Sequence, residues 1–397
     1  MNKEMYFIPS DIIKNTRPDY PYVKMAWVPG STPPDIQDKM LEEGFSLPIS
    51  PDIMEVLSRK PIAAELYLTR TCVLNCFGCS VPDFIKKGKE ERAPIEEWKR
   101  MLEILALHTK AVKFIGGEVG GLPELPELAK TAVDLGLFTS IFTDGVPFLD
   151  DEEKLSTLVD ATGGKIVLHT SVDVPPPNGI KNEATDKSRQ FKANHGYELM
   201  KLAQKYKIPI IGHMMIHQPN AGDVIEIYNA VIDHGGIFSI GTMQKSVHLY
   251  QGREPKGFTN ALRDEDRKLV QEQMALLIAI EDERLQKGQS RTLANSRAHL
   301  ATMHTVGIDQ NIGCTGEGRS PAVLAIMPDL SPRSCPVVLV PEQEKECPGC
   351  SYGVFRDGDP DWAEHLFIKG LYEKPVDRED FPSIFYPTEA NNDLTGI

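Results

Sequence analysis

Three cysteines near residue 70 have the spacing that could perform chemistry. Cys72, Cys76 and Cys79 lie within eight residues, too close together to form separate disulfides with one another. Thiolates at this spacing can share one soft metal centre. Three ligands leave one iron of an iron–sulfur cubane open to a small molecule, whereas a structural zinc ion normally takes four protein ligands. The spacing therefore predicts a metal centre with an open, reactive position.

The other cysteines form a second group towards the carboxyl end. The chain has seven cysteines, and the remaining four are Cys314, Cys335, Cys347 and Cys350. Four thiolates at these spacings could hold either a zinc ion or an iron–sulfur cluster. Because no cysteine is left over, we expect two metal centres rather than scattered buried thiols.

Composition limits the class of protein. The 397 residues are 41% hydrophobic and carry a formal net charge of −14, which makes nucleic acid an unexpected partner. We find neither an apolar run long enough to span a membrane nor a signal peptide at the start of the sequence. We therefore expect a cytoplasmic, reducing location, which suits exposed metal thiolates.

Strand and helix patterns alternate from residue 63 onward. This alternation predicts a parallel sheet with helices outside it, and ligands at the carboxyl ends of the strands. The expected strands are 63–68, 111–115, 138–142, 165–171, 208–216 and 237–242. The expected helices are 95–107, 125–135, 150–159 with Asp150 as its cap, 191–205, 223–233 and a long charged helix over 261–287.

Polar residues follow several of these strands. Gly116, Gly117 and Glu118 come after the second strand, where glycines allow close backbone approach and the carboxylate can accept from an ammonium. Thr143 follows the third strand, and Ser171 and Asp173 follow the fourth. We expect these side chains to gather beside the cysteine loop, because the carboxyl ends of parallel strands share one edge.

The cysteine spacing resembles the signature of the radical S-adenosylmethionine (SAM) superfamily. The resemblance implies that Cys72, Cys76 and Cys79 hold a 4Fe-4S cluster whose open iron binds SAM. Reductive cleavage of SAM then yields a 5′-deoxyadenosyl radical, which abstracts a hydrogen atom from the substrate. The fold implied is an α/β partial (β/α)6 TIM-like barrel.

The same resemblance assigns roles around the cofactor. The family's Gly-Gly-Glu motif, here Gly116 to Glu118, holds the amino group of SAM. Arg189 fits an Asp-x-x-Arg motif whose arginine pairs with the SAM carboxylate. The other expected cofactor contacts are Thr143, Ser171, Asp173 and Met243, and Asn220 matches a frequent family asparagine.

The carboxyl-terminal cysteines resemble a SPASM/twitch-type domain. Cys314 and Cys335 bracket an expected strand over 322–327 and a turn at Pro328 and Asp329, where Leu330 replaces the usual glycine. With four cysteines available, the resemblance implies one auxiliary 4Fe-4S cluster. The expected domains are an N-terminal extension (1–62), the barrel (63–260), a bridging helix with the auxiliary-cluster domain (261–355) and a tail (356–397).

Two redox centres favour net oxidation. We expect the enzyme to carry out dehydrogenation, oxidative decarboxylation or cross-linking of a small metabolite, with an external reductant such as flavodoxin or ferredoxin. An alternative is a maturase that modifies a ribosomal peptide. An alternative of another class is a zinc-binding or electron-transfer protein without radical catalysis.

Overall fold

The computed structural model of the chain describes residues 63–72, 74, 92–109, 111–176, 187–242, 262–289, 292–295, 300 and 323–333. The predicted N-terminal extension and C-terminal tail lie outside these residues, and the proposed domain boundaries remain predictions. Among the described helices, none is both long and apolar enough to cross a lipid bilayer.

The centre of the fold is an eight-stranded sheet with strand order β6-β5-β4-β3-β2-β1-β7-β8. Neighbouring strands from β6 to β7 pair in parallel, and only the last pair, β7 with β8, is antiparallel. This is an α/β partial TIM-like barrel, as the family resemblance implies, and its parallel sheet is the one that the alternating pattern predicts. The strands are β1 (Ala63–Thr69), β2 (Ala111–Gly116), β3 (Phe138–Phe142), β4 (Val167–Ser171), β5 (Ile210–Ile216), β6 (Ile237–Thr242), β7 (Val323–Ile326) and β8 (Pro332–Arg333).

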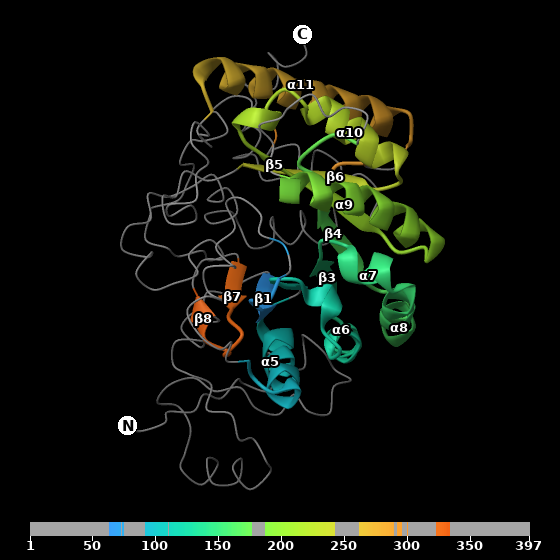
Figure 1. The fold of residues 1–397 in the computed structure, drawn as a ribbon, viewed down its shortest axis with the longest axis vertical. Helices are drawn as coiled ribbons and strands as arrows, with labels where there is room; N and C mark the ends of the chain where they lie inside the picture. Colours follow the sequence, from blue (N-terminus) through green and yellow to red (C-terminus); the bar gives the residue numbers. More distant parts are fainter. Residues whose placement is uncertain are drawn as a thin grey trace, which may run out of the picture.

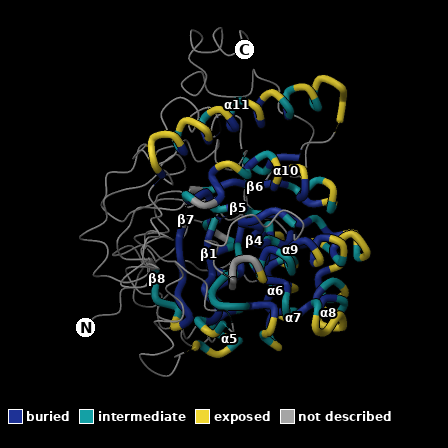
Figure 2. The backbone as a smooth tube through the Cα atoms, turned by 45° about the horizontal axis from the view of Figure 1, so that its top comes forward, coloured by how far each residue is buried: buried dark blue, intermediate teal, exposed yellow. Residues whose placement is uncertain are grey.

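Helices follow the strands along one side of the sheet (Figure 1). Their exposed residues face away from it, as the yellow segments of Figure 2 show for α8, α9 and α11. The helices are α5 (Ile95–His108), α6 (Leu125–Asp134), α7 (Val146–Asp150), α8 (Glu152–Thr162), α9 (Lys187–Lys205), α10 (Val224–Asp233) and α11 (Asp264–Gln286). Two short 3₁₀ turns, η1 (Val119–Gly121) and η3 (Gln218–Asn220), follow β2 and β5.

The main hydrophobic core lies between the sheet and these helices. Strand residues such as Leu66, Phe114 and Leu168 are fully buried there, together with Leu102 and Leu105 of α5. Burial of a side chain of this size stabilises the fold by about 1.5–3 kcal/mol. Alternate residues of the strands point to the opposite, inner face, where Tyr67, Ala325 and Met327 form a separate small cluster.

The predicted helix cap at Asp150 is wrong. Asp150 is the last residue of α7, and the cap of α8 is Asp151, whose side chain accepts from the Glu153 N–H at 3.2 Å. Asp151 has extended backbone (φ −147°), the conformation that lets a capping side chain reach back to the first turn. Helix α9 also begins four residues earlier than predicted, at Lys187.

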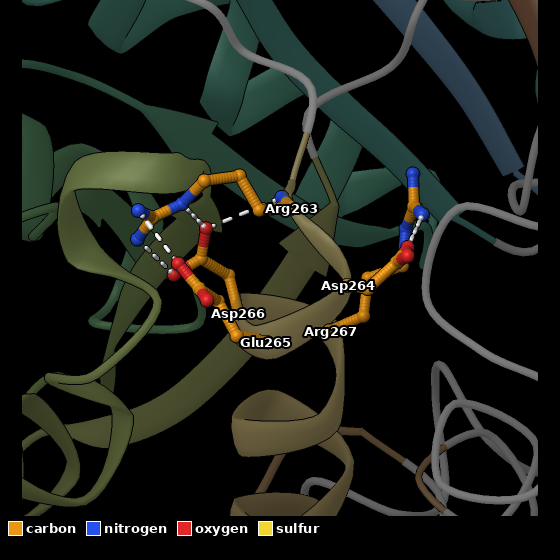
Figure 3. A network of polar contacts seen from close by, with 5 residues as sticks. All are labelled: Arg263, Asp264, Glu265, Asp266 and Arg267. Carbon is orange, nitrogen blue, oxygen red and sulfur yellow. Dashed lines mark hydrogen bonds and ion pairs between the residues drawn. The ribbon is translucent and has the colours of Figure 1, made fainter.

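The long charged helix is present as α11, and its first turn holds an ion-pair network (Figure 3). Arg263 is the N-cap residue of the helix. Two of its guanidinium nitrogens donate hydrogen bonds to the Asp266 carboxylate, at 2.7 and 2.8 Å. The Arg263 backbone N–H also donates to Asp266, at 3.2 Å. This capping arrangement places the helix start at Asp264 rather than at residue 261.

The strand expected between Cys314 and Cys335 is β7, and it joins the barrel sheet. Ala63 to Leu66 of β1 pair in parallel with Val323 to Ile326. At the following turn Leu330 has φ +63°, a left-handed conformation in which glycine carries no steric cost. The turn is held by Asp329 Oδ1, which accepts from the Ser331 N–H at 3.0 Å.

Candidate active site at the carboxyl ends of the strands

The loop that carries the first cysteine leaves the end of β1. The Thr71 N–H donates to Thr69 Oγ1 at 2.9 Å, and the Leu74 N–H donates to Cys72 Sγ at 3.4 Å. Cys72 is half-buried. Backbone N–H groups that point at a sulfur are typical of loops that hold metal thiolates. Cys76 and Cys79 lie outside the described residues.

The Gly116–Gly117 segment lies directly against this loop. The Gly117 N–H donates to the Thr69 carbonyl at 2.7 Å, and the Glu118 N–H donates to the Thr71 carbonyl at 2.8 Å. Gly116 has φ +145°, and a Cβ there would lie 2.2 Å from the Thr69 carbonyl oxygen. Glycine is therefore required by the close approach of two backbones, and this approach brings Glu118 beside the cysteine loop.

The Glu118 carboxylate joins the ends of β2 and β3. Its Oε1 accepts from the Gly120 N–H and from Thr143 Oγ1, each at 2.6 Å. Its Oε2 accepts from the Asp144 N–H at 2.6 Å. Burial, and then the neighbouring Asp144 carboxylate, raise the pKa of Glu118 to about 8. The carboxylate is thus fixed in position yet poised to gain or lose a proton near neutral pH.

Asp144 follows Thr143 and is almost wholly buried, with 3% of its surface exposed. Its Oδ1 accepts from the Val146 N–H at 3.0 Å at the start of α7. Its Oδ2 is buried and has no hydrogen-bond partner among the described residues. Two carboxyl groups therefore meet at this corner, and one oxygen has nothing to accept from.

The loops after β4 and β5 are tied to each other through Asp173. The Met215 N–H donates to Asp173 Oδ1 at 2.8 Å, and Asn220 Nδ2 donates to the Asp173 carbonyl at 2.9 Å. Ser171, the last residue of β4, is buried. Asn220 therefore has a structural role in joining these loops, and Asp173 lies at the same strand edge as Glu118.

For the remaining predicted site residues, the structure describes no side-chain contacts. Arg189 lies in the first turn of α9, after the end of β4. Met243 and the carboxyl-terminal cysteines Cys314, Cys335, Cys347 and Cys350 lie outside the described residues. Their roles remain predictions.

The inner face of the sheet carries a polar group that the sequence reasoning missed. Lys113 Nζ lies 3.3 Å from Glu65 Oε1, across β2 and β1. Lys113 Nζ also lies 4.9 Å from the centre of the Phe142 ring, and the His169 ring centre lies 6.0 Å from that of Phe142. Burial, followed by the charges of Lys113 and His213, holds the pKa of His169 well below its usual range, so this ring is neutral.

A signal for these residues exists in the sequence. Lys113 interrupts an apolar strand at a position that alternation assigns to the inner face, and Glu65 is its register partner on β1. His213, at an inner position of β5, contacts Ser239 Oγ at 3.0 Å, whereas His217 contacts the Met215 carbonyl. These two histidines therefore make separate polar contacts, although they are only four residues apart.

The described groups fit an amino-acid-bearing cofactor beside a metal thiolate. A half-buried thiol, an immobilised carboxylate and a buried unpartnered oxygen share one strand edge. Residues 66–231 match the model of the Radical SAM superfamily. This part of the chain is a radical SAM domain. The matched region covers the end of β1, the cysteine loop, the Gly-Gly-Glu segment and strands β2 to β5.

Curated relatives in this superfamily align with less than half of the chain. A PqqA peptide cyclase from Bradyrhizobium diazoefficiens is 30% identical over 177 residues, which are 44% of this chain and 44% of that protein. A PqqA peptide cyclase from Ruegeria pomeroyi is 36% identical over 179 residues, 44% of this chain and 45% of its own length.

Solved radical SAM structures share the fold. Streptococcus suis SuiB bound to precursor peptide SuiA aligns with a TM-score of 0.51 at 15% identity, over 87% of this chain and 78% of SuiB. The enzyme anSMEcpe with bound AdoMet and a peptide aligns with a TM-score of 0.52 at 16% identity, over 82% of this chain and 87% of its own. At these identities the likeness concerns the fold alone.

Proposed function

We propose that this protein is a radical SAM enzyme that modifies a peptide substrate. The observation that carries the proposal is the pair of backbone hydrogen bonds between the Gly-Gly-Glu segment and the cysteine loop, Gly117 to Thr69 and Glu118 to Thr71. They bring a carboxylate suited to an ammonium beside a thiol suited to iron. Both groups lie at the strand edge where barrel enzymes bind their ligands.

In this proposal the cofactor is held by residues of three strand ends. Cys72, Cys76 and Cys79 ligate one 4Fe-4S cluster, and Glu118 and Arg189 take the amino and carboxylate groups of SAM. Thr143 fixes the Glu118 carboxylate through its 2.6 Å hydrogen bond. When bound, the cluster and SAM supply a 5′-deoxyadenosyl radical that abstracts a hydrogen atom from the substrate.

The peptide substrate now takes precedence over the small metabolite that the sequence favours. The relatives named above are peptide cyclases, and SuiB and anSMEcpe were each solved with a peptide bound. Cross-linking or oxidation of a peptide side chain remains within the oxidative chemistry expected from the sequence. An external reductant such as flavodoxin or ferredoxin would supply the electron that starts each turnover.

The inner face of the barrel would receive the reacting part of the peptide. Lys113 and Glu65 offer a charged pair, and His169 offers a neutral imidazole, all on the face opposite the helices. Lys192 of α9 lies 5.3 Å from the same Phe142 ring that Lys113 contacts. These side chains would orient a polar substrate group relative to the cofactor.

The carboxyl-terminal cysteines would hold one auxiliary cluster. Cys314, Cys335, Cys347 and Cys350 supply four thiolates, enough for a closed 4Fe-4S site. The β7–β8 hairpin between Cys314 and Cys335 is anchored on β1, the strand that leads into the first cysteine loop. This common anchor supports a role for the second cluster in electron transfer from the substrate.

Anaerobic reconstitution tests the proposal. We expect iron and sulfide at two 4Fe-4S clusters per chain, and reductant-dependent cleavage of SAM to 5′-deoxyadenosine. The Cys72→Ala/Cys76→Ala/Cys79→Ala variant should lose cleavage but keep one cluster, which separates the two sites. Coexpression with a short peptide encoded beside the gene should change the mass of that peptide. Binding of zinc without iron, or no cleavage of SAM by reconstituted wild-type protein, would contradict the proposal.

A further inference from the structure

Two carboxyl groups meet where β2 and β3 end, and they accept different numbers of hydrogen bonds. Glu118 accepts three hydrogen bonds, from Gly120, Thr143 and Asp144. Asp144 accepts one, from Val146, and its second oxygen is buried without a partner among the described residues. A buried carboxylate oxygen without a donor is costly, so a group that binds there has a strong acceptor available.

Among the described residues, no cation pairs with Glu118 or Asp144. The charged group that acts on Glu118 is Asp144, which has the same sign, and its hydrogen-bond donors are the neutral Gly120 N–H, Thr143 hydroxyl and Asp144 N–H. Titratable groups on neighbouring elements include Cys72 on the loop after β1 and His195 on α9, but neither is among the causes of the raised Glu118 pKa. Two adjacent buried carboxylates cannot both stay ionised without a counter-ion, so the pair needs either a proton or a ligand cation.

We propose that Asp144 is a second carboxylate for the ligand's ammonium group, and that this ammonium replaces the proton held by the Glu118 carboxyl group beside it. The proposal rests on the proposed function, because the ligand is SAM or an analogue with the same amino-acid end. The ammonium would donate a hydrogen bond to Asp144 Oδ2 and balance one of the two negative charges of the carboxylates. Each binding event then releases one proton to solvent, and no other bond changes.

The chemistry of both partners supports this exchange near neutral pH. The pKa of Glu118 is raised to about 8 by burial and by Asp144. A free α-amino group has a pKa of about 7.7–8.0, so the ligand arrives as an ammonium at pH 7. Ligand affinity should therefore rise as pH rises towards 8, because fewer pairs must give up a proton.

Calorimetry in buffers of different ionisation enthalpy counts this proton. The protein is the anaerobically reconstituted enzyme, and the probe is S-adenosylhomocysteine, which carries the ammonium but has no sulfonium to cleave. At about pH 7 we expect close to one proton released per ligand for the wild type. For Asp144→Asn we expect a smaller proton release and a weaker rise of affinity with pH between about 6 and 8, because burial alone still raises the pKa of Glu118.

Two controls separate the ammonium from other contributions. The ligand 5′-methylthioadenosine lacks the amino-acid end and should release no proton from either protein. Asp134→Asn makes the same chemical change at an exposed carboxylate and should behave as the wild type. Equal proton release by wild type and Asp144→Asn would overturn the proposal.

The wild type alone decides the question if Asp144→Asn does not fold. Binding of S-adenosylhomocysteine without proton release overturns this inference and leaves the proposed function standing. Failure of the wild type to bind either ligand overturns both. Proton release with S-adenosylhomocysteine but not with 5′-methylthioadenosine supports the inference.

Discussion

Gly117 packs against the Thr71 carbonyl so closely that a Cβ on Gly117 would lie 2.0 Å from the Thr71 oxygen. No real Cβ approaches an oxygen so closely, and the obstructing atom is backbone rather than a flexible side chain. The same two segments exchange the Glu118 N–H to Thr71 hydrogen bond at 2.8 Å. Contact between the end of β2 and the cysteine loop therefore depends on the absence of a side chain at residue 117.

Gly117→Ala is expected to displace the cysteine loop and to lower the iron bound by the first site. The clash forces the backbone to move, and loss of the contacts that orient metal ligands typically weakens metal binding by about 10–100-fold. Iron content after reconstitution, and the ultraviolet–visible absorbance of the cluster, measure the effect. Gly121→Ala is the matched control, because its added Cβ would meet only Pro147, at 3.8 Å. Equal iron loading of both variants would contradict the prediction.

Glu118 should make the stability of the ligand-free protein fall as pH rises. Its folded-state pKa of about 8 lies above its ordinary value of 4.5, so the folded state holds an extra proton between these values. That contribution is present at low pH and is lost as pH rises towards 8, with a slope of up to about 1.4 kcal/mol per pH unit. Glu118→Gln should flatten the slope.

The informative window for this measurement is about pH 6.5 to 8. Burial lowers the pKa of His108 from 6.5 to about 4, so His108 adds a slope of opposite sign only at lower pH. Thermal melts of wild type and Glu118→Gln across the window give the difference. An unchanged slope in the variant would show that Glu118 does not titrate there.

Local patterns in the sequence predict the strands of the barrel well. The six expected strands are present as β1 to β6, because each is a short apolar run bounded by turn residues. The Gly-Gly-Glu segment was also identifiable, since glycines at a strand end indicate close backbone contact. The structure supplies the partner of that contact, the Thr69 to Thr71 backbone, which no local pattern specifies.

Long-range features could not be predicted in this way. Pairing of β7 with β1 joins residues far apart in sequence, and four apolar residues do not reveal their neighbour. Asp150 and Asp151 are equally good caps by residue type, and only the extended backbone of Asp151 selects it. The unpartnered oxygen of Asp144 is likewise a property of packing.

Asp266 is expected to stabilise the start of α11 at neutral pH and to lose this effect in acid. Its paired hydrogen bonds from Arg263 lower the pKa of the Asp266 carboxyl (Figure 3). A lowered pKa gives stability that is present above the ordinary value of 3.8 and is lost as pH falls through the lower, folded-state value. Asp266→Asn should therefore cost about 1 kcal/mol at neutral pH and less at about pH 3.

Asp264→Asn is the matched control for this cap. The Asp264 side chain is 99% exposed and forms an ion pair with Arg267, so its loss should hardly change stability. Thermal melts at both pH values compare the two variants. A constant deficit of Asp266→Asn from neutral to acid pH would argue against the ionic origin of the effect.

Glu281 of α11 should hold the strand-like segment beside β6. Its carboxylate accepts from the Thr292 N–H at 3.1 Å, from Thr292 Oγ1 at 2.8 Å and from the Leu293 N–H at 3.4 Å. That segment in turn pairs with Phe238 of β6, through hydrogen bonds from Phe238 to Thr292 and from Ala294 to Phe238. The buried Glu281 carboxylate thus accepts the N–H groups that a further strand would otherwise accept on the outer side of this segment.

Glu281→Ala should leave these buried donors unsatisfied and destabilise the protein by about 3 kcal/mol. Urea unfolding followed by circular dichroism gives the overall loss. Hydrogen exchange gives the local one, since the Thr292 and Leu293 amides should exchange faster in the variant. Glu283→Ala, an exposed residue two positions away that pairs with Lys287, should leave these amides protected. Unchanged protection of Thr292 and Leu293 in Glu281→Ala would mean that β6 alone holds the segment.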